Sequence, residues 1–410
     1  MQATSSLPVN LSVAIVSRYP PFGQTHVGRG IAAYTRNLAE HLAASGVTTH
    51  VLAEQTGPDE EHYVDNSVLV HRVWRHGSDV SGSVINNLKG IGASLVHLQY
   101  ELFMFGAGLK GARQVPTLLH NIRRMLGLPV VTTMHGVLPR GPLDRDFTSA
   151  YVTGVPSWAI RRVYDSVTKS VVQQSDLVIA HGWSILASVH AYARPSLSLV
   201  IPHGIESTMT LPDRGAALKR FGLADVPRAV FFGYRLPYKG IETLEAAAPL
   251  LSDHGIEVLV AGGSADDADP TGSSRHRITQ GNATRQLGFI EEGDIPNLFA
   301  VADVLVLPYR VGMATSGPLA SAASYGTSVV ISDVPSLAEM LDFSLATFPV
   351  GDSQALAETV LRVLKDDDVR AGLRARLAAL ALESSWASVA DRSVNAYLKV
   401  VRVLQEREIV

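Results

Sequence analysis

Two consecutive blocks, in which short β-branched runs alternate with segments of helical periodicity, constrain the fold of this chain most. The first block extends from Leu11 to Ile201 and the second from Ala229 to Ser332, with an irregular stretch at Ile205–Pro212 between them. Strand–helix alternation is typical of parallel α/β sheets. The 410 residues exceed the roughly 250 to 300 at which single cores stop growing, so we predict two Rossmann-like α/β domains.

The element boundaries follow from the same patterns. We expect a helix from about Gly30 to Ser45, because apolar residues recur there at helical spacing, and a helical region from Ser353 to the end with Trp386 as an apolar anchor. The predicted strands are Leu11–Val16, Thr48–Ala53, Ser94–Leu98, Val130–Met134, Leu177–Ala180 and Leu197–Ile201, then Ala229–Gly233, Glu257–Ala261, Gln286–Phe289, Val304–Pro308 and Ser328–Ser332.

The composition excludes several classes of protein. A net charge of −3 argues against a general nucleic-acid binder, and the absence of cysteine excludes disulfides, zinc–thiolate sites and a cysteine nucleophile. No apolar run approaches the roughly 18 residues that a membrane-spanning helix needs. We therefore expect a cytoplasmic protein, either soluble or attached to a membrane surface.

Two cations follow one predicted strand of the second block. Arg235 and Lys239 lie just past the apolar run that ends at Gly233, and Gly240 opens an amphipathic stretch. Ligands of open α/β sheets bind outside the carboxyl ends of the strands. A guanidinium beside an ammonium suits a diphosphate, so we predict that Arg235 and Lys239 bind one.

A second anion site is predicted after the strand Val304–Pro308. A helix is expected to start at Pro318, and Thr315 or Ser316 can cap it, with Gly317 between them and the helix. The free backbone N–H groups at such a helix start attract anions. Two anion sites in one domain suit a sugar nucleotide.

The first strand–helix connection offers a weaker site. Gly28 and Gly30 precede the first helix, where glycines let backbone N–H groups approach a phosphate. The full dinucleotide fingerprint is missing, although Glu54 lies near the position of its acidic residue.

Three histidines lie at or near predicted strand ends. His135 follows the strand Val130–Met134, and His97 and His203 occupy comparable places. We predict that His135 is a catalytic residue, because it follows the carboxyl end of a predicted strand, where ligands of such sheets bind. The three come from separate strands without a pair four residues apart, so we predict no metal site.

In their order along the chain these motifs resemble the fourth family of retaining glycosyltransferases. The similarity lies in Phe232–Arg235 with Lys239–Gly240, Leu287–Phe289, Ala302–Val304, Pro308–Tyr309 and Tyr325–Thr327, and for the N-terminal half in the Gly-rich loop, Thr133–Gly136, Ser175–Asp176 and Ile201–Gly204. The resemblance implies the GT-B fold, in which two Rossmann-like domains face each other across a cleft. Residues 1–205 would then bind the acceptor, residues 206–385 the donor, and residues 386–410 would cross back to the first domain.

The same resemblance implies transfer of a hexose, mannose among the candidates, from a GDP- or UDP-linked sugar to a carbohydrate, lipid-linked or small-molecule acceptor. It implies no metal or other cofactor, retention of configuration and a role in polysaccharide biosynthesis. Gly233, Gly288, Phe289 and Ser321 join the donor-binding residues on this basis. The leaving diphosphate would take the acceptor proton, so catalysis would rest on orientation and on charge stabilisation.

One departure from the family pattern concerns its two glutamates. Alignment on Gly326 places Met313 and Ser321 at their positions, and neither side chain is a carboxylate. Two alternatives therefore stay open: a non-catalytic protein that binds sugar nucleotides or glycans, and another enzyme on the same fold, such as a sugar-nucleotide epimerase or, less favoured without a pyridoxal-phosphate lysine context, a phosphorylase.

Overall fold

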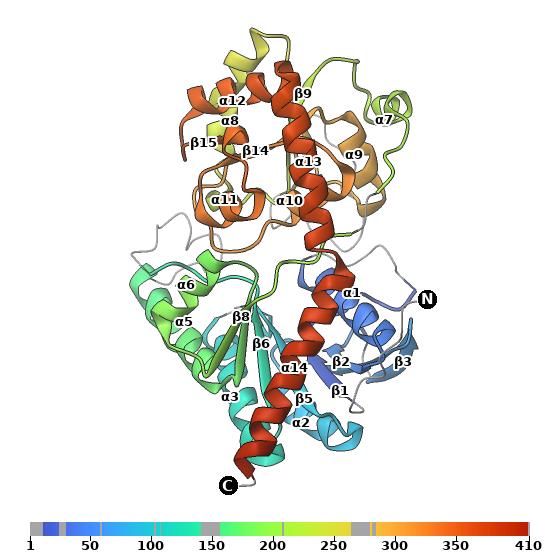
Figure 1. Ribbon diagram of the computed structural model, residues 1–410, viewed down its shortest axis with the longest axis vertical. Helices are drawn as coiled ribbons and strands as arrows, with labels where there is room; N and C mark the ends of the chain where they lie inside the picture. Colours follow the sequence, from blue (N-terminus) through green and yellow to red (C-terminus); the bar gives the residue numbers. More distant parts are fainter. Residues whose placement is uncertain are drawn as a thin grey trace. The chain divides into compact units, whose positions relative to one another are not determined.

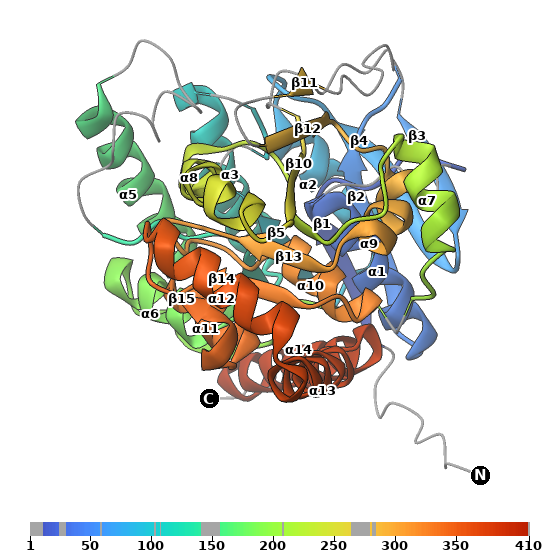
Figure 2. The same ribbon diagram turned by 90° about the horizontal axis from the view of Figure 1, so that it is seen from above.

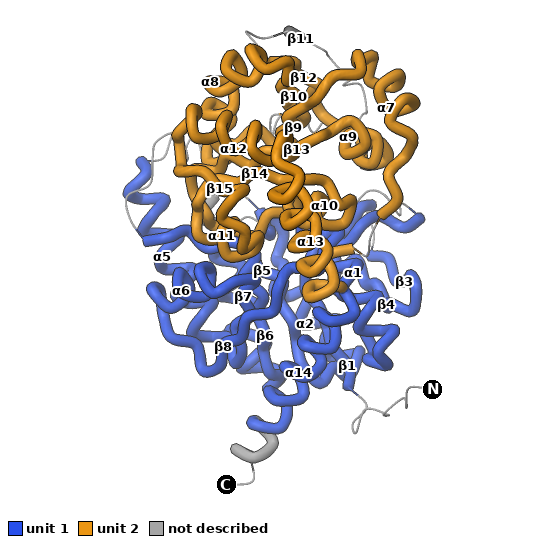
Figure 3. The backbone as a smooth tube through the Cα atoms, turned by 45° about the horizontal axis from the view of Figure 1, so that its top comes forward, with its two compact units in different colours: residues 1–148, 152–204, 386–410 blue, residues 149–151, 205–385 orange. Residues whose placement is uncertain are grey.

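The computed structural model describes residues 11–23, 30–57, 60–101, 104–106, 108–140, 156–206, 209–263, 279–280 and 284–408. These residues form two compact units (Figure 3). Unit 1 takes the described residues up to 204 together with those from Trp386 onward, and unit 2 takes Ile205–Ser385.

Unit 1 is built on an eight-stranded sheet with the order β3-β4-β2-β1-β5-β6-β7-β8 (Figure 1). Its strands are β1 (Ser12–Val16), β2 (Thr48–Glu54), β3 (Glu61–Asp65), β4 (Val68–Trp74), β5 (Leu95–Tyr100), β6 (Val130–Met134), β7 (Leu177–Ala180) and β8 (Leu197–Val200). All neighbours are parallel except the edge pair β3 and β4. The first strand, β1, lies between β2 and β5.

The helices of unit 1 cover this sheet. They are α1 (Ile31–Ala44), α2 (Val80–Ile91), α3 (Gly108–Asn121, followed by a π-helical turn at Ile122–Leu126), α5 (Ser157–Gln174), α6 (Trp183–Tyr192) and α14 (Trp386–Glu408). The last helix lies alongside α1 (Figure 1). Both pack on the face that carries Val13, Ile15 and Val51, so alternate strand residues bury their side chains under these helices.

Unit 2 contains a seven-stranded sheet with the order β11-β12-β10-β9-β13-β14-β15. Its strands are β9 (Arg228–Phe232), β10 (Glu257–Ala261), β11 (Thr279–Gln280), β12 (Thr284–Gly288), β13 (Val304–Leu307), β14 (Val329–Ser332) and β15 (Thr347–Phe348). Only the β11–β12 pair is antiparallel among these described strands.

Helices cover both faces of the second sheet, as Figure 2 shows. They are α7 (Arg214–Phe221), α8 (Ile241–Ser252), α9 (Ile295–Val301), α10 (Gly317–Tyr325), α11 (Pro335–Leu341), α12 (Ser353–Lys365) and α13 (Asp367–Glu383), with 3₁₀ turns at Pro237–Lys239, Glu292–Asp294 and Ser344–Ala346. In the central strand β9, Phe231 packs in the cluster with α8 and α12, whereas Val230 packs with α7 and α9. The alternation follows the two-residue period of a strand buried on both faces.

The predicted fold class of two Rossmann-like α/β domains is confirmed, and each sheet adds one antiparallel pair at an edge, β3–β4 and β11–β12. The sequence reading missed β3, β4, β11 and β15. Three of these, β3, β11 and β15, are edge strands, which are short or little buried, so their apolar signal is weak, whereas β4 lies one strand in from the edge. In β3 only alternate residues are half-buried, and β4 carries His71 and the fully buried Arg72.

Residues at the start of α14 fix this helix within unit 1. Trp386 is buried, and a Cβ atom built on Gly204 would lie 2.3 Å from its indole ring. Only glycine fits at that approach. Tyr397, further along α14, is fully buried and bonds to His97 of β5. No helix in the described part of the chain combines the length and the apolar character needed to cross a lipid bilayer.

Candidate functional site

The carboxyl edge of the unit 2 sheet contains the point where the strand order reverses. From β9 the chain moves to β10 on one side, and the later strand β13 lies on the other. The ends of β9 and β13 therefore flank the place at which open α/β sheets bind ligands.

Three glycines bring the strand ends of this edge close together. Gly233 N–H donates to the oxygen of Ala261 at 3.0 Å, and Gly262 N–H donates to the oxygen of Gly288 at 2.7 Å. A Cβ atom at Gly262 would lie 1.8 Å from the oxygen of Gly233, and φ of Gly262 is 151°. Glycine is required there, because any side chain would overlap the backbone of Gly233.

Lys239 occupies the centre of the edge. It ends the 3₁₀ turn after β9, is 7% exposed, and holds its ammonium 5.5 Å from the ring centroid of Tyr309, the second residue after β13. A Cβ atom on Gly233 would lie 2.6 Å from Lys239 Nζ. Among the described residues no carboxylate forms an ion pair with this ammonium. A largely buried cation without a counter-charge favours an anionic ligand.

The start of α10 lies against the same place. Ser316 caps the helix, since its Oγ accepts a hydrogen bond from Leu319 N–H at 3.3 Å, as the sequence predicted. A Cβ atom on Gly233 would lie 3.7 Å from Pro318 in the first turn. Thr315 Oγ1 is buried and has no hydrogen-bond partner within the described ranges. The helix dipole and the free N–H groups of the first turn therefore add to the charge of Lys239.

Arg235 has different neighbours from Lys239, although the sequence places both after one strand. Its guanidinium donates to Gln286 of β12 at 3.3 Å and lies 3.8 Å from the carboxylate of Glu245 in α8. The side chain is 43% exposed. The two cations thus lie in unlike surroundings, because the turn after β9 directs one toward β12 and the other toward β13.

The structure places the remaining predicted residues as follows. Gly30 caps α1 with φ of 56°, whereas Gly28 lies outside the described residues. Gly317 is exposed, with nothing within 4 Å of a Cβ atom built on it, and Phe289, directly after β12, is half-buried. Ser321 is half-buried in the second turn of α10.

His135 belongs to unit 1, where it meets histidines that follow neighbouring strands. Its Nε2 donates to Gln99 Oε1 at 2.7 Å, and its Nδ1 lies 3.4 Å from His181 Nε2. Burial lowers the pKa of His135 well below its usual value, and His181, His203 and His97 lower it further. The imidazole is therefore neutral at physiological pH. The sequence analysis overlooked His181, although it directly follows the predicted strand Leu177–Ala180.

The sequence analysis placed His97 near a strand end, and this is wrong. The residue lies inside β5, where its Nδ1 is 2.7 Å from the hydroxyl of Tyr397 and its Nε2 is 2.8 Å from Thr133 Oγ1. Burial lowers its pKa to about 3. His97 thus joins α14 to the sheet. Within the described ranges, no three His, Asp or Glu side chains are arranged to hold a metal ion.

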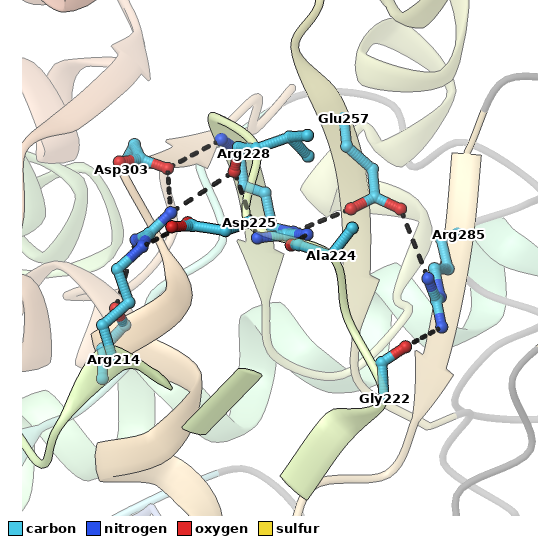
Figure 4. Close-up of polar contacts among 10 residues, drawn as sticks. Arg214, Gly222, Ala224, Asp225, Arg228, Glu257, Arg285 and Asp303 are labelled. Atoms are coloured by element: carbon cyan, nitrogen blue, oxygen red, sulfur yellow. Dashed lines mark hydrogen bonds and ion pairs between the residues drawn. The ribbon is translucent and has the colours of Figure 1, made fainter. Parts of the chain in front are cut away.

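The opposite, amino edge of the unit 2 sheet carries a network of ion pairs (Figure 4). Arg228 at the start of β9 has a fully buried side chain, and its Nε donates to Glu257 of β10 at 2.7 Å. Glu257 also lies 3.6 Å from Arg285, and Arg214 donates to Asp303 at 3.1 Å. These charges are matched within the protein.

Two family models match most of the chain. Residues 28–208 match the model described as Glycosyltransferase Family 4, and residues 226–366 match the model described as Glycosyl transferases group 1. The chain belongs to glycosyltransferase family 4. The first match covers most of unit 1 and ends just past Ile205, where unit 2 begins, and the second match lies within unit 2.

Curated relatives in the family include two mannosyltransferases. The chain is 31% identical over 185 residues to the O-antigen chain mannosyltransferase B of Escherichia coli, which covers 44% of this chain and 48% of that protein. It is 28% identical over 175 residues to a phosphatidyl-myo-inositol mannosyltransferase of Mycolicibacterium smegmatis, covering 41% and 44%. The chain thus aligns with about half the length of these relatives.

Solved structures show the family fold over almost the whole chain. A sucrose-phosphate synthase of Thermosynechococcus elongatus superposes with a TM-score of 0.71 at 20% identity, covering 96% of this chain and all of that one. HepE of Anabaena, solved in complex with UDP and glucose, superposes with a TM-score of 0.65 at 16% identity, covering 94% and 99%. The fold is therefore GT-B, with two α/β units.

Proposed function

We propose that this protein transfers a hexose from a nucleotide diphosphate sugar, GDP- or UDP-linked, to a carbohydrate or lipid-linked acceptor, with retention of configuration and without a metal ion. Unit 2 would hold the donor and unit 1 the acceptor. The single observation that carries the proposal is the ammonium of Lys239, which lies between Gly233, Tyr309 and the start of α10 and has no carboxylate partner among the described residues.

The chemistry of this site suits a diphosphate leaving group. In the transfer the bond between the anomeric carbon and the phosphate oxygen breaks, and a bond to the acceptor oxygen forms on the same face. The acceptor proton passes to the departing phosphate. Negative charge grows on that phosphate, and Lys239 together with the N–H groups at the α10 start would stabilise it.

Family relatives support the sugar and the donor class. Two relatives are mannosyltransferases, and structural neighbours were solved with UDP and glucose or with a UDP-linked fluorosugar. The O-antigen relative supports a place in polysaccharide biosynthesis, and a lipid-linked acceptor would bring the protein to a membrane surface.

The test compares Lys239→Met with Lys219→Met, a matched change of an exposed lysine on α7. Calorimetry with UDP and with GDP measures affinity, and a panel of UDP- and GDP-linked hexoses measures product formation. Charge-assisted hydrogen bonds are worth about 1.5–3 kcal/mol, so the better nucleotide should bind roughly 10- to 100-fold more weakly to Lys239→Met. Equal affinity in the two variants would refute the donor site.

One observation favours a second candidate, a protein that binds sugar nucleotides without turnover. Both Met313 and Ser321, which the alignment on Gly326 would place at the family's two glutamates, are half-buried near the start of α10. Nucleotide binding that depends on Lys239, without product from any donor in the panel, would support this candidate.

A further inference from the structure

Unit 1 has its own point of strand reversal, and charged side chains surround it. The order β2-β1-β5 places β1 between its successor and a later strand, as β9 is placed in unit 2. Arg18 follows β1, Glu54 ends β2, His76 follows β4 and Glu101 follows β5. These strands run parallel, so the four side chains share one edge of the sheet.

Direct contacts join three of these four side chains. Arg18 Nη2 lies 2.9 Å from His76 Nε2, and the same ring nitrogen lies 3.0 Å from Glu54 Oε1. Arg18 Nε lies 3.5 Å from Glu54 Oε2. The side chains are 31% to 40% exposed, so a ligand can reach them.

These contacts cannot all be hydrogen bonds. A ring nitrogen of histidine carries either a proton or a lone pair. If His76 Nε2 is unprotonated, it accepts from Arg18, and its lone pair cannot bond to the carboxylate of Glu54. If Nε2 is protonated, it donates to Glu54 and cannot accept from Arg18. In addition, Arg18 Nε is buried and has no hydrogen-bond partner among the described residues. Within the described chain, the cluster therefore leaves either this N–H and an oxygen of Glu54, or two N–H groups of Arg18, without a partner.

Glu101 completes the cluster on the β5 side. Part of the residue is exposed, yet the surrounding protein desolvates its carboxyl and raises its pKa, while the charge of Arg18 lowers it. Arg18 thus interacts with two carboxyl groups, that of Glu54 at the end of β2 and that of Glu101 after β5.

We propose that Arg18, Glu54, His76 and Glu101 form the acceptor subsite, and that this subsite takes an uncharged sugar through its hydroxyl groups. The inference rests on the proposed transferase function and names the chemical class of its acceptor.

Two arguments select a hydroxyl over a phosphate. A hydroxyl both donates and accepts, so it can accept from Arg18 and donate to a glutamate, whereas a phosphate dianion only accepts and cannot bond to either carboxylate. Two carboxylates also stand against one guanidinium, and they repel an anion. The site after β9 shows the reverse pattern, because the cation of Lys239 has no carboxylate partner in the described part of the chain.

The experiment uses the full chain saturated with its better nucleotide, UDP or GDP. The probes are the methyl glycosides of mannose, glucose, galactose and N-acetylglucosamine, and the 6-phosphates of the same sugars, with binding followed by ligand-observed NMR. The variants are Glu54→Gln and Glu101→Gln, which keep the size of the side chain. Glu61→Gln, an exposed change on the edge strand β3, is the control.

We expect at least one neutral glycoside to bind, at least about 10-fold more weakly in Glu54→Gln and Glu101→Gln and unchanged in Glu61→Gln. The matching 6-phosphate should bind more weakly than the glycoside. Absence of glycoside binding, equal binding in all variants, or tighter binding of the phosphate would overturn the assignment. Nucleotide affinity, measured separately on each variant, should stay constant, so failure of this subsite is distinct from failure of the donor site at Lys239.

Discussion

The two edges of the unit 2 sheet differ in whether their buried cations are paired with carboxylates. At the amino edge, Arg228, fully buried, is paired with Glu257, and the surrounding arginines and carboxylates also match (Figure 4). At the carboxyl edge, Lys239 is almost as deeply buried, yet has no carboxylate partner in the described chain. Buried charge that is matched internally holds the fold, and buried charge left unmatched indicates a ligand.

The largest effect should come from the matched edge. Arg228→Met leaves Glu257 and the carbonyls of Ala224 and Val226 without the guanidinium that now bonds to them. Removing one member of a buried pair costs about 3–5 kcal/mol. We expect about 3 kcal/mol, because Glu257 keeps Arg285. Calorimetric unfolding measures the change. Nucleotide affinity should stay as in the wild type. A weaker affinity in the folded variant would contradict the conclusion that Arg228 acts only on stability.

Arg235→Ala tests the exposed cation of the carboxyl edge. Its pair with Glu245 is open to solvent, so the pair adds little stability and a diphosphate can replace it. We expect kcat/KM for transfer to fall at least about 10-fold, with the unfolding temperature unchanged. Wild-type kcat/KM would remove Arg235 from the donor site and leave Lys239 as its cation.

Ser321→Ala should have a smaller effect, confined to the donor. A serine hydroxyl gives one neutral hydrogen bond to the ribose, so its loss should cost about 1 kcal/mol, or roughly a five-fold rise in donor KM. Ser324→Ala on the same helix is the matched control, because Ser324 Oγ donates to Glu206 O and Ala320 O and thereby supports the fold. A raised KM in Ser324→Ala and not in Ser321→Ala would place the ribose elsewhere.

Chelation should have no effect. If Lys239, Arg235 and the α10 start offset the charge of the diphosphate, transfer needs no divalent ion. Initial rates in EDTA should equal those in buffer. Loss of activity that magnesium or manganese restores would show that the carboxyl edge needs an added cation to balance the donor.

The sequence alone determined the central elements of both units. Strands β6, β7 and β10 have the predicted bounds, and Ser316 caps the predicted helix. These features depend on periodicity and capping within a few residues, which the chain carries locally. The position of Lys239 after a strand end was also predicted locally, from the apolar run that ends at Gly233.

Only the tertiary structure decided which side chains meet. Arg235 bonds to a residue 51 positions away, and His97 bonds to Tyr397, 300 positions away. The contact between Arg18 and His76, 58 positions apart, could not be predicted from the sequence either. Such contacts depend on strand order and helix packing, which bring distant segments together without leaving a pattern in either segment. Local sequence therefore indicates the chemistry of each strand end, and the fold determines which of these groups act together.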